Sequence, residues 1–200
     1  MNKKLKIYLF TICLLFYTNN AWAVKAKVRF LFPVFIKNVT DGFEDSTLKT
    51  SEFVLAFLMP LSRDTTLDLG YSYFNARIKD PSTVSESYSG FFRAHLLEIG
   101  AGYSGFSLTR TITLVFDTAV RIPVSGQAEV KGTPAKSEAK SISGMGYFLS
   151  AGAAYGNLEV SLFYQHRDLS FDGLTVSRNS EIKDVAIHST EYGIGFGYTF

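Results

Sequence analysis

The chain has 200 residues, with 20 Lys and Arg, 18 Asp and Glu, one Cys and one Trp. A formal net charge of +2 gives little electrostatic reason to bind nucleic acid, one cysteine excludes an intrachain disulfide, and the length suits one domain.

Residues 1–23 have the pattern of a secretory signal peptide. The basic residues are Lys3, Lys4 and Lys6, and the apolar core is residues 7–17. Ala21 and Ala23 form an A-x-A cleavage site. The apolar core is shorter than the roughly 20 residues of a transmembrane helix. We therefore expect a mature domain of residues 24–200. Because the leader holds three basic residues and no acidic ones, the mature net charge is −1, and no nucleic-acid partner is expected.

Large apolar residues alternate with smaller or polar ones in eight segments of the mature chain. A period of two places successive side chains on opposite faces of a strand, so each segment predicts a strand with one apolar face. The segments are residues 26–36, 53–61, 67–73, 97–103, 112–122, 145–155, 158–164 and 192–200. We take each strand to have about the 9–11 residues that a tilted strand needs to cross a bilayer.

The connections between these segments alternate in length. Four long polar loops are expected at residues 37–51, 76–90, 125–143 and 167–186, and short turns at residues 62–65, 104–110 and 156–157. Outer-membrane barrels have long extracellular loops and short periplasmic turns. With eight strands, both ends of the mature chain lie on the side of the short turns.

The faces opposite the apolar ones are rich in glycine. These residues are Gly70, Gly100, Gly102, Gly144, Gly146, Gly152, Gly193, Gly195 and Gly197. The competing interpretation is a soluble β-sandwich or lipocalin-like barrel, but glycine fills a core poorly. In a membrane barrel the large apolar side chains face lipid, and the glycines leave room for charged side chains crossing the lumen. The sequence therefore predicts an all-β fold, an eight-stranded antiparallel up-and-down transmembrane β-barrel.

Three prolines fall within or near the predicted strands. Pro33, Pro60 and Pro123 cannot donate a backbone hydrogen bond, so we expect them at barrel rims or at bulges.

Ten charged residues have the parity of the lumen-facing positions. Lys27, Arg29, Asp68, Glu98, Asp117 and Glu159 belong to its lower half, and Glu52, Arg121, Arg167 and Glu191 to its upper half. An eight-stranded barrel is just wide enough for side chains to fill, and an unpaired buried charge is costly. We expect a salt-bridged plug; a narrow, porin-like pore is the alternative. Glu191 is expected to pair with a basic residue such as Arg121 or Arg167.

The mature chain as a whole resembles the small eight-stranded outer-membrane barrels, namely the OmpA transmembrane domain, OmpX, Ail and the opacity-type proteins. The resemblance is carried by Ala21-Trp22-Ala23, by residues 146–155, and by the alternating terminal residues Tyr192, Ile194, Phe196, Tyr198 and Phe200. It implies export to the outer membrane of a Gram-negative bacterium, and a monomer in contact with outer-membrane lipid and lipopolysaccharide. It also implies that the terminal strand is an assembly signal read by the barrel assembly machinery.

No catalytic, metal-binding or cofactor-binding motif is present, and we expect no enzyme. Some outer-membrane barrels are lipid A acyl hydrolases with an outward-facing His, Ser and acidic residue. Here His95, His166 and His188 have outward parity, but Ser189 and Glu191 point inward, so a lipid A-modifying activity is the more distant alternative. The expected role is structural or surface interaction, adhesin-like, with a host or surface ligand bound at the extracellular loops.

Overall fold

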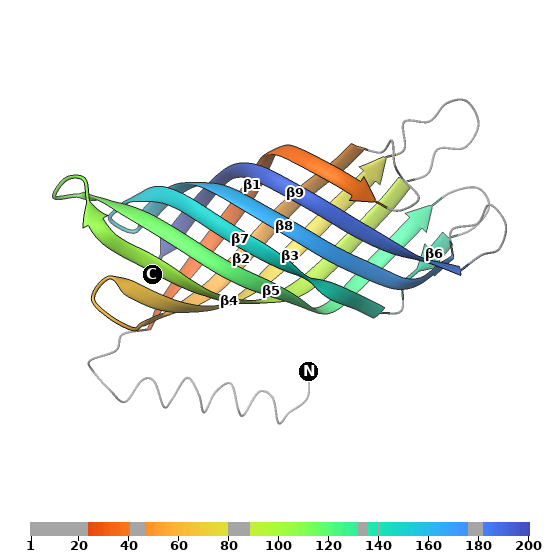
Figure 1. Ribbon diagram of the computed structural model, residues 1–200, viewed down its shortest axis with the longest axis horizontal. Helices are drawn as coiled ribbons and strands as arrows, with labels where there is room; N and C mark the ends of the chain where they lie inside the picture. Colours follow the sequence, from red (N-terminus) through yellow and green to blue (C-terminus); the bar gives the residue numbers. More distant parts are fainter. Residues whose placement is uncertain (1–23, 41–46, 80–88, 132–135, 140, 176–181) are drawn as a thin grey trace, which may run out of the picture.

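The computed structural model describes residues 24–40, 47–79, 89–131, 136–139, 141–175 and 182–200. The predicted leader, with its cleavage residues Ala21 and Ala23, lies outside the described residues. The described residues form nine strands (Figure 1). They are β1 (Lys25–Thr40), β2 (Thr47–Pro60), β3 (Thr65–Lys79), β4 (Ser89–Ser107), β5 (Ile112–Lys131), β6 (Lys136–Glu138), β7 (Ser141–Tyr155), β8 (Leu158–Thr175) and β9 (Ile182–Thr199).

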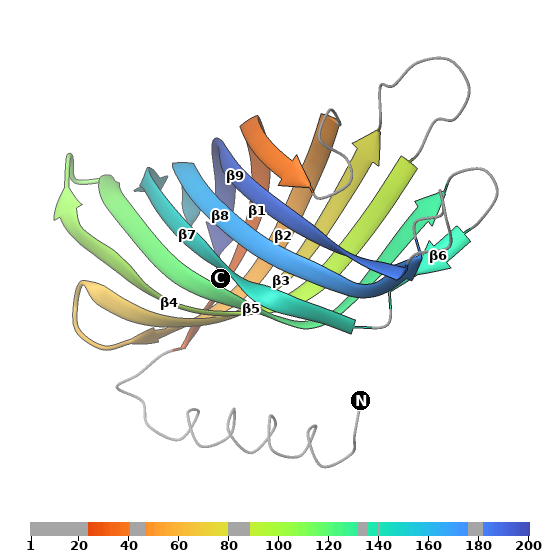
Figure 2. The ribbon, with the colours of Figure 1, turned by 45° about the vertical axis from the view of Figure 1, so that its right-hand side comes forward.

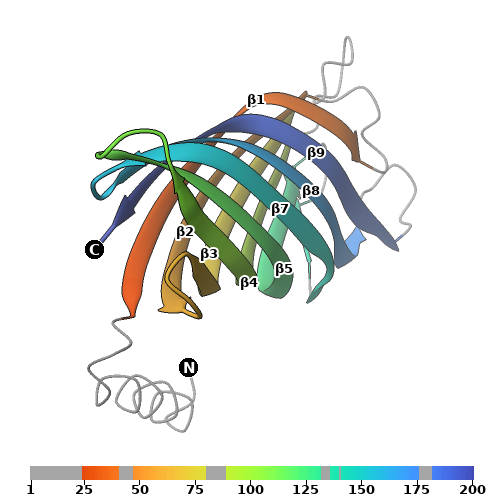
Figure 3. The ribbon, with the colours of Figure 1, turned by 60° about the vertical axis from the view of Figure 1, so that its left-hand side comes forward.

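Eight of these strands close into an antiparallel barrel. Each strand pairs with its neighbour along the chain, and β1 closes the circle against β9, with Lys27 opposite Thr199 and Arg29 opposite Gly197 (Figure 3). The short strand β6 adds an arm to the far end of β5 (Figure 2). The first residues of β1 and the last of β9 lie at the end of the barrel that carries the short turns (Figure 1). The predicted fold class is confirmed.

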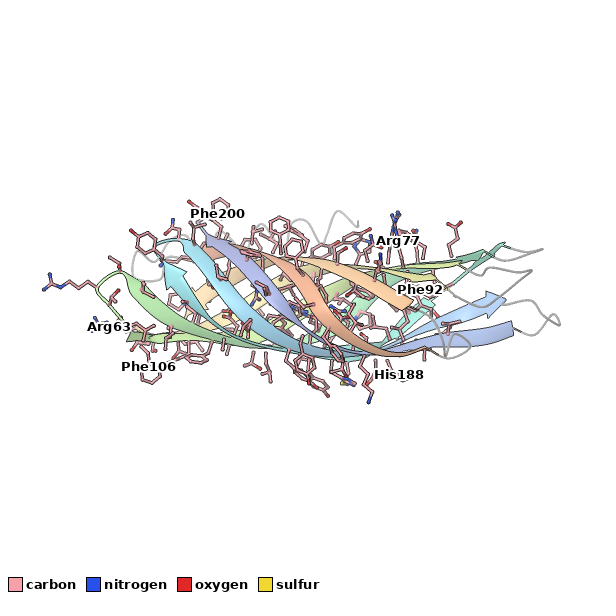
Figure 4. All side chains as sticks on the ribbon, turned by 90° about the horizontal axis from the view of Figure 1, so that it is seen from above. Arg63, Arg77, Phe92, Phe106, His188 and Phe200 are labelled. Atoms are coloured by element: carbon pink, nitrogen blue, oxygen red, sulfur yellow. The ribbon has the colours of Figure 1, made fainter. Side chains whose placement is uncertain are left out.

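The outside of the barrel carries the apolar faces of the strands. Phe32, Ile99 and Leu162 are typical, with exposed fractions of 53%, 50% and 69%. Side chains project outward along both edges of the barrel in Figure 4. The described residues contain no helix that is long and apolar enough to cross a membrane. A soluble domain buries such side chains, so this exterior is the surface of a barrel that lies in lipid.

The strands are longer than predicted at the loop end. The four long loops are shorter than predicted, because the strands before them continue further. The predicted loops were residues 37–51, 76–90, 125–143 and 167–186, whereas β1, β3, β5 and β8 continue to Thr40, Lys79, Lys131 and Thr175. The short connection predicted at residues 104–110 is also shorter than expected, since β4 ends at Ser107 and β5 begins at Ile112. Backbone hydrogen bonding between strands does not depend on lipid, so the ladder continues beyond the apolar band.

The two faces of the strands exchange character where the barrel leaves the apolar band. Above the band, the lumen holds a buried apolar cluster, the upper core. It comprises Phe74, Ala76, Phe92, Ala94, Leu96, Ala128, Leu169, Phe171, Val185 and Ile187, with Ile36, Ala139 and Ile142 packed against it. The exposed residues outside it are polar: Lys49, Ser51, Arg77, Arg93, Gln127, Ser143 and His188. This is the pattern of a water-soluble barrel built on a membrane barrel.

The prolines lie where the ladder tolerates a missing donor. The register between β1 and β9 shifts between Pro33 and Phe35, and the register between β4 and β5 shifts beside Pro123. Pro60 ends β2 at a turn. The expectation of rims and bulges is confirmed. The bulge also corrects the predicted facing of Ile36, which packs against the upper core, while Phe35 is exposed.

The glycine face of β9 predicts a graded response to added side-chain volume. A Cβ at Gly193 would clash with the Phe32 carbonyl and lie 2.7 Å from the Phe163 ring, whereas a Cβ at Gly197 would lie no closer than 3.3 Å to Glu159. We expect Gly193→Ala to destabilise the barrel by about 1–3 kcal/mol through overpacking, and Gly197→Ala to have a smaller effect. Urea unfolding, followed by the folded band on unboiled gels, measures both. Equal losses would contradict this account.

Candidate functional site: the lumen and the outer rim

The structure places all ten predicted lumen residues inside the barrel, and each is at most 8% exposed. They come from seven strands, β1, β2, β3, β4, β5, β8 and β9, because the same inward parity recurs around the barrel. The set is Lys27, Arg29, Glu52, Asp68, Glu98, Asp117, Arg121, Glu159, Arg167 and Glu191.

The lower part of the lumen is organised around the two cations of β1. Lys27 Nζ lies 2.9 Å from Asp117 Oδ2 and 2.5 Å from Glu159 Oε2. Arg29 donates to the same Asp117 oxygen at 3.2 Å and also to Glu98. Because each cation contacts two carboxylates from other strands, these five residues tie β1 across the lumen to β4, β5 and β8.

The upper part continues the same chain of ion pairs. Arg121 Nε donates to Glu98 Oε2 at 2.8 Å, and Arg121 Nη1 lies 3.0 Å from Glu52. Arg167 bridges Glu52 and Glu191, with Nη1 2.5 Å from Glu191 Oε1. An unbroken series of ion pairs therefore runs from Glu159 near the short turns to Glu191 beneath the upper core.

Aromatic rings contact the guanidinium groups along this series. The ring centre of Phe148 is 4.9 Å from Arg29 Cζ and 4.3 Å from Arg121 Cζ, and the ring centre of Phe74 is 4.1 Å from Arg167 Cζ. Cation–π contacts stabilise charges that have left water. Sequence reasoning did not single out these rings, although their parity opposite the lipid-facing residues places them in the lumen.

One carboxylate of the lumen stands apart from the network. Asp68 is 1% exposed, and in the described part of the chain no basic group lies within ion-pair distance of it. It accepts a hydrogen bond from Thr66 Oγ1 at 2.7 Å. The set therefore holds six carboxylates and four cations, and Asp68 is the carboxylate left over.

The outward histidines lie at the upper edge of the apolar band. His188 Nδ1 is 2.7 Å from Asp168 Oδ1, and His166 bridges Asp168 Oδ2 at 3.2 Å and Thr190 Oγ1 at 3.0 Å. The hydrogen bond from His188, and then the proximity of His166, hold the pKa of Asp168 below its usual value. This contribution to stability is present above the normal aspartate pKa and is lost as the pH falls through the lowered one. His95 instead contacts the ring and hydroxyl of Tyr71.

The acid, imidazole and hydroxyl groups of Asp168, His166 and Thr190 resemble parts of an acyl-transfer site. Sequence reasoning considered Ser189 and Glu191 for this role, and both are buried in the lumen. Thr190 was missed, although its parity is that of the histidines. Strand β8 pairs with β7 and β9 at this level, which engages the backbone N–H groups that an oxyanion would need. The described residues also contain no metal-binding group of three or more His, Cys, Asp or Glu.

The terminal residues proposed as an assembly signal form one exposed stripe. Tyr192, Ile194, Phe196, Tyr198 and Phe200 have exposed fractions from 36% to 70%. Phe32 packs edge-on against Phe196, so the stripe is continuous with the exterior of β1.

The charge network predicts unequal losses of stability for substitutions at two neighbouring aspartates. Asp117→Asn removes the carboxylate shared by Lys27 and Arg29, so we expect a loss of about 3 kcal/mol. Asp68→Asn keeps an acceptor for Thr66 and removes no ion pair, so we expect stability within about 1 kcal/mol of the wild type. Urea unfolding followed on unboiled gels again measures stability. Tryptophan fluorescence does not serve, because the chain's one tryptophan, Trp22, lies in the predicted leader. A larger loss for Asp68→Asn would contradict the assignment.

Comparison with known proteins finds structural similarity at low sequence identity. No family model matches the chain, and no curated protein matches it. The structure is similar to Neisserial surface protein A (14% identity, TM-score 0.43, covering 90% of this chain and 98% of that one). It is also similar to Ail of Yersinia pestis (13%, 0.47, 88% and 99%) and to OprG of Pseudomonas aeruginosa (12%, 0.36, 90% and 95%). By its own closed ladder of strands, the chain is an eight-stranded antiparallel barrel, the fold expected from its resemblance to small outer-membrane proteins.

Proposed function

We propose that this protein is a monomeric outer-membrane barrel with a closed lumen, and that it acts through its extracellular end, in a structural or surface-interaction role. The observation that carries the proposal is the filled interior. Ion pairs occupy the membrane-spanning part of the lumen, and the upper core lies above them. A barrel that conducts nothing serves as an anchor for what it presents outside.

Three features support the outer-membrane location. The exterior band is apolar while the charges are inside, which is the arrangement required in lipid. Residues 1–23 have the features of an export signal, to be removed after Ala23. The terminal aromatic stripe is suited to recognition by the barrel assembly machinery before β9 closes against β1.

Outside the membrane, the extended strands form a stiff platform for the loops. The ladder carries the chain to Thr40, Lys79, Lys131 and Thr175. Residues 41–46, 80–88, 132–135 and 176–181, within the predicted loops, lie outside the described residues. Loops held by a rigid scaffold are the usual carriers of binding function, so a host or surface ligand, as for an adhesin, would bind there.

The porin-like alternative requires a path through the lumen. In planar bilayers we expect purified protein to show no stable conductance, because Arg29 and Arg121 lie in the lumen against Phe148 and pair with carboxylates of other strands. Protein taken from the outer-membrane fraction, with different mobility before and after boiling, is the material to use. Reproducible porin-sized steps would favour the pore, and a soluble periplasmic protein without the mobility shift would refute the membrane barrel.

The apolar band makes a second, position-dependent prediction. Leu162 is exposed within the band, whereas Ser143 is exposed above it. We expect Leu162→Arg to destabilise the barrel in lipid vesicles by about 2–4 kcal/mol and Ser143→Arg to have little effect. Urea unfolding in vesicles compares the two. Similar effects at both positions would show that the band does not lie in the hydrocarbon region.

A further inference from the structure

The closed ladder of the barrel stops short of its upper end in two places. Among the described residues, the pairing of β1 with β2 ends at Leu31 opposite Glu52, although both strands continue above this level. The pairing of β5 with β7 ends in the same way at Arg121 opposite Gly146. We call the unpaired stretches above these two levels the β1/β2 seam and the β5/β7 seam.

The local sequence explains why the ladders end there. Pro33 on β1 and Pro123 on β5 each come two residues after the last paired residue of their strand, and neither can donate a backbone hydrogen bond. Across the β5/β7 seam, Gly144 has a φ of 122°, which lies outside the strand region. Both seams are therefore built into the chain by residues that interrupt a ladder.

The seams lie opposite one another and divide the upper end into two sheets. The order around the barrel is β1, β2, β3, β4, β5, β7, β8, β9, so four strands separate one seam from the other. The first sheet consists of β2, β3, β4 and β5, and the second of β7, β8, β9 and β1. Within each sheet the ladders continue above the seams, as between β3 and β4 or between β8 and β9.

The upper core lies between these two sheets and holds them together. Phe92 of the first sheet packs edge-on against Phe171 of the second, with ring centres 5.2 Å apart. At the β5/β7 seam, a Cβ at Gly126 would lie 3.1 Å from Ile142 Cβ, so side-chain packing closes the seam where the ladder is missing. The upper end is therefore a small β-sandwich. The first sheet contributes Phe74, Ala76, Phe92, Ala94, Leu96 and Ala128 to the upper core, and the second Leu169, Phe171, Val185 and Ile187.

The ion pairs of the lumen lie at the lower end of both seams. Glu52 and Arg121, the last paired residues of β2 and β5, are joined across the lumen, with Arg121 Nη1 3.0 Å from Glu52 Oε1. Arg167 of the second sheet also pairs with Glu52. Slightly higher, Thr50 Oγ1 donates to Glu191 Oε2 at 2.9 Å. The charge network therefore fastens the barrel at the level where the two sheets begin.

We propose that the two sheets of the upper end part along both seams in one movement, while the ion-paired barrel below stays closed. In the described part of the chain, this movement separates apolar side chains but breaks no ladder hydrogen bond, because the seams carry none. Releasing a single strand would instead break the ladder that holds it in its sheet. Regions with a low cost of opening separate while the rest of a protein stays folded. The extracellular end thereby has a second state, with the upper core open to the outside.

A disulfide across one seam tests this movement, since the chain's one cysteine, Cys13, lies in the predicted leader. Gly126→Cys/Ile142→Cys joins the two sheets, because the Cβ separation of 3.1 Å is a few tenths of an ångström short of that in a disulfide. Arg93→Cys/Gln127→Cys is the control, since it joins β4 to β5 within the first sheet at the same level. Hydrogen–deuterium exchange of the folded barrel in detergent, followed by mass spectrometry, is the measurement.

In the wild type we expect the backbone amides above the seams to exchange together in both sheets, and about tenfold or more faster than amides of the same strands in the apolar band. The seam disulfide should slow this exchange in both sheets, the control disulfide should leave it unchanged, and reduction should restore it. Equal protection above and below the seams overturns the proposal, and so does fast exchange that persists with the seam disulfide formed. Unboiled gels confirm that each variant is folded.

Thiol labelling gives a second readout that needs no disulfide. Ala94 lies in the upper core and Ala56 in the lumen below the seams, and both are 0% exposed. We expect a small maleimide to label Ala94→Cys in the folded protein about tenfold or more faster than Ala56→Cys, because only the upper core opens. Equal rates at the two positions would show that the sheets do not part independently of the barrel.

Discussion

The interior of an eight-stranded barrel has room for side chains and little else, so a charge placed there must find its partner there. This constraint accounts for the series of ion pairs from Glu159 to Glu191. Each cation contacts carboxylates on other strands, which couples strands far apart in the sequence. Gly197 of β9 contributes to the same arrangement, because a Cβ at this position would lie 3.6 Å from Arg29 Cγ, so the glycine leaves room for the arginine to cross the lumen. Phe148 and Phe74 fill the spaces that the charges leave.

The exchange of the two faces along each strand follows from a change of solvent and not of backbone. In lipid, the apolar side chains point out and the charges point in; above the lipid, the same ladder turns apolar side chains inward, as any soluble barrel does. The strands therefore continue as long as one of their two faces can bury apolar side chains, either in lipid or in the lumen. The position along the strands at which the two faces exchange marks the membrane surface. Above this position, the upper core covers the ion pairs.

A lumen filled in this way is the reason for proposing a role at the outside of the barrel. The two outward clusters at the membrane edge differ in what they leave unsatisfied. Around Asp168, the imidazoles and the carboxylate hydrogen-bond one another, whereas Arg77 and Arg93 stack on Phe91 without an ion pair to any described residue, although Glu129 lies in register with Phe91. An internally paired cluster stabilises the barrel. This contrast is the reason for assigning a structural role to the histidines.

The sequence by itself determined the number of barrel strands, the alternation of long and short connections, and the lumen position of Arg29, Glu98 and Arg167, because a period of two assigns every side chain to a face. It did not determine where the strands end. Above the apolar band the outward-facing residues of the strands are polar, and in sequence they cannot be distinguished from loop residues. It misplaced Ile36, because a one-residue bulge after Pro33 reverses the facing of the later residues of β1. Only the tertiary structure decided which charges meet, that Asp68 is left over, and that the strands above Glu52 and Arg121 divide into two sheets. Those facts depend on register between strands, which brings together residues that no spacing along the chain relates.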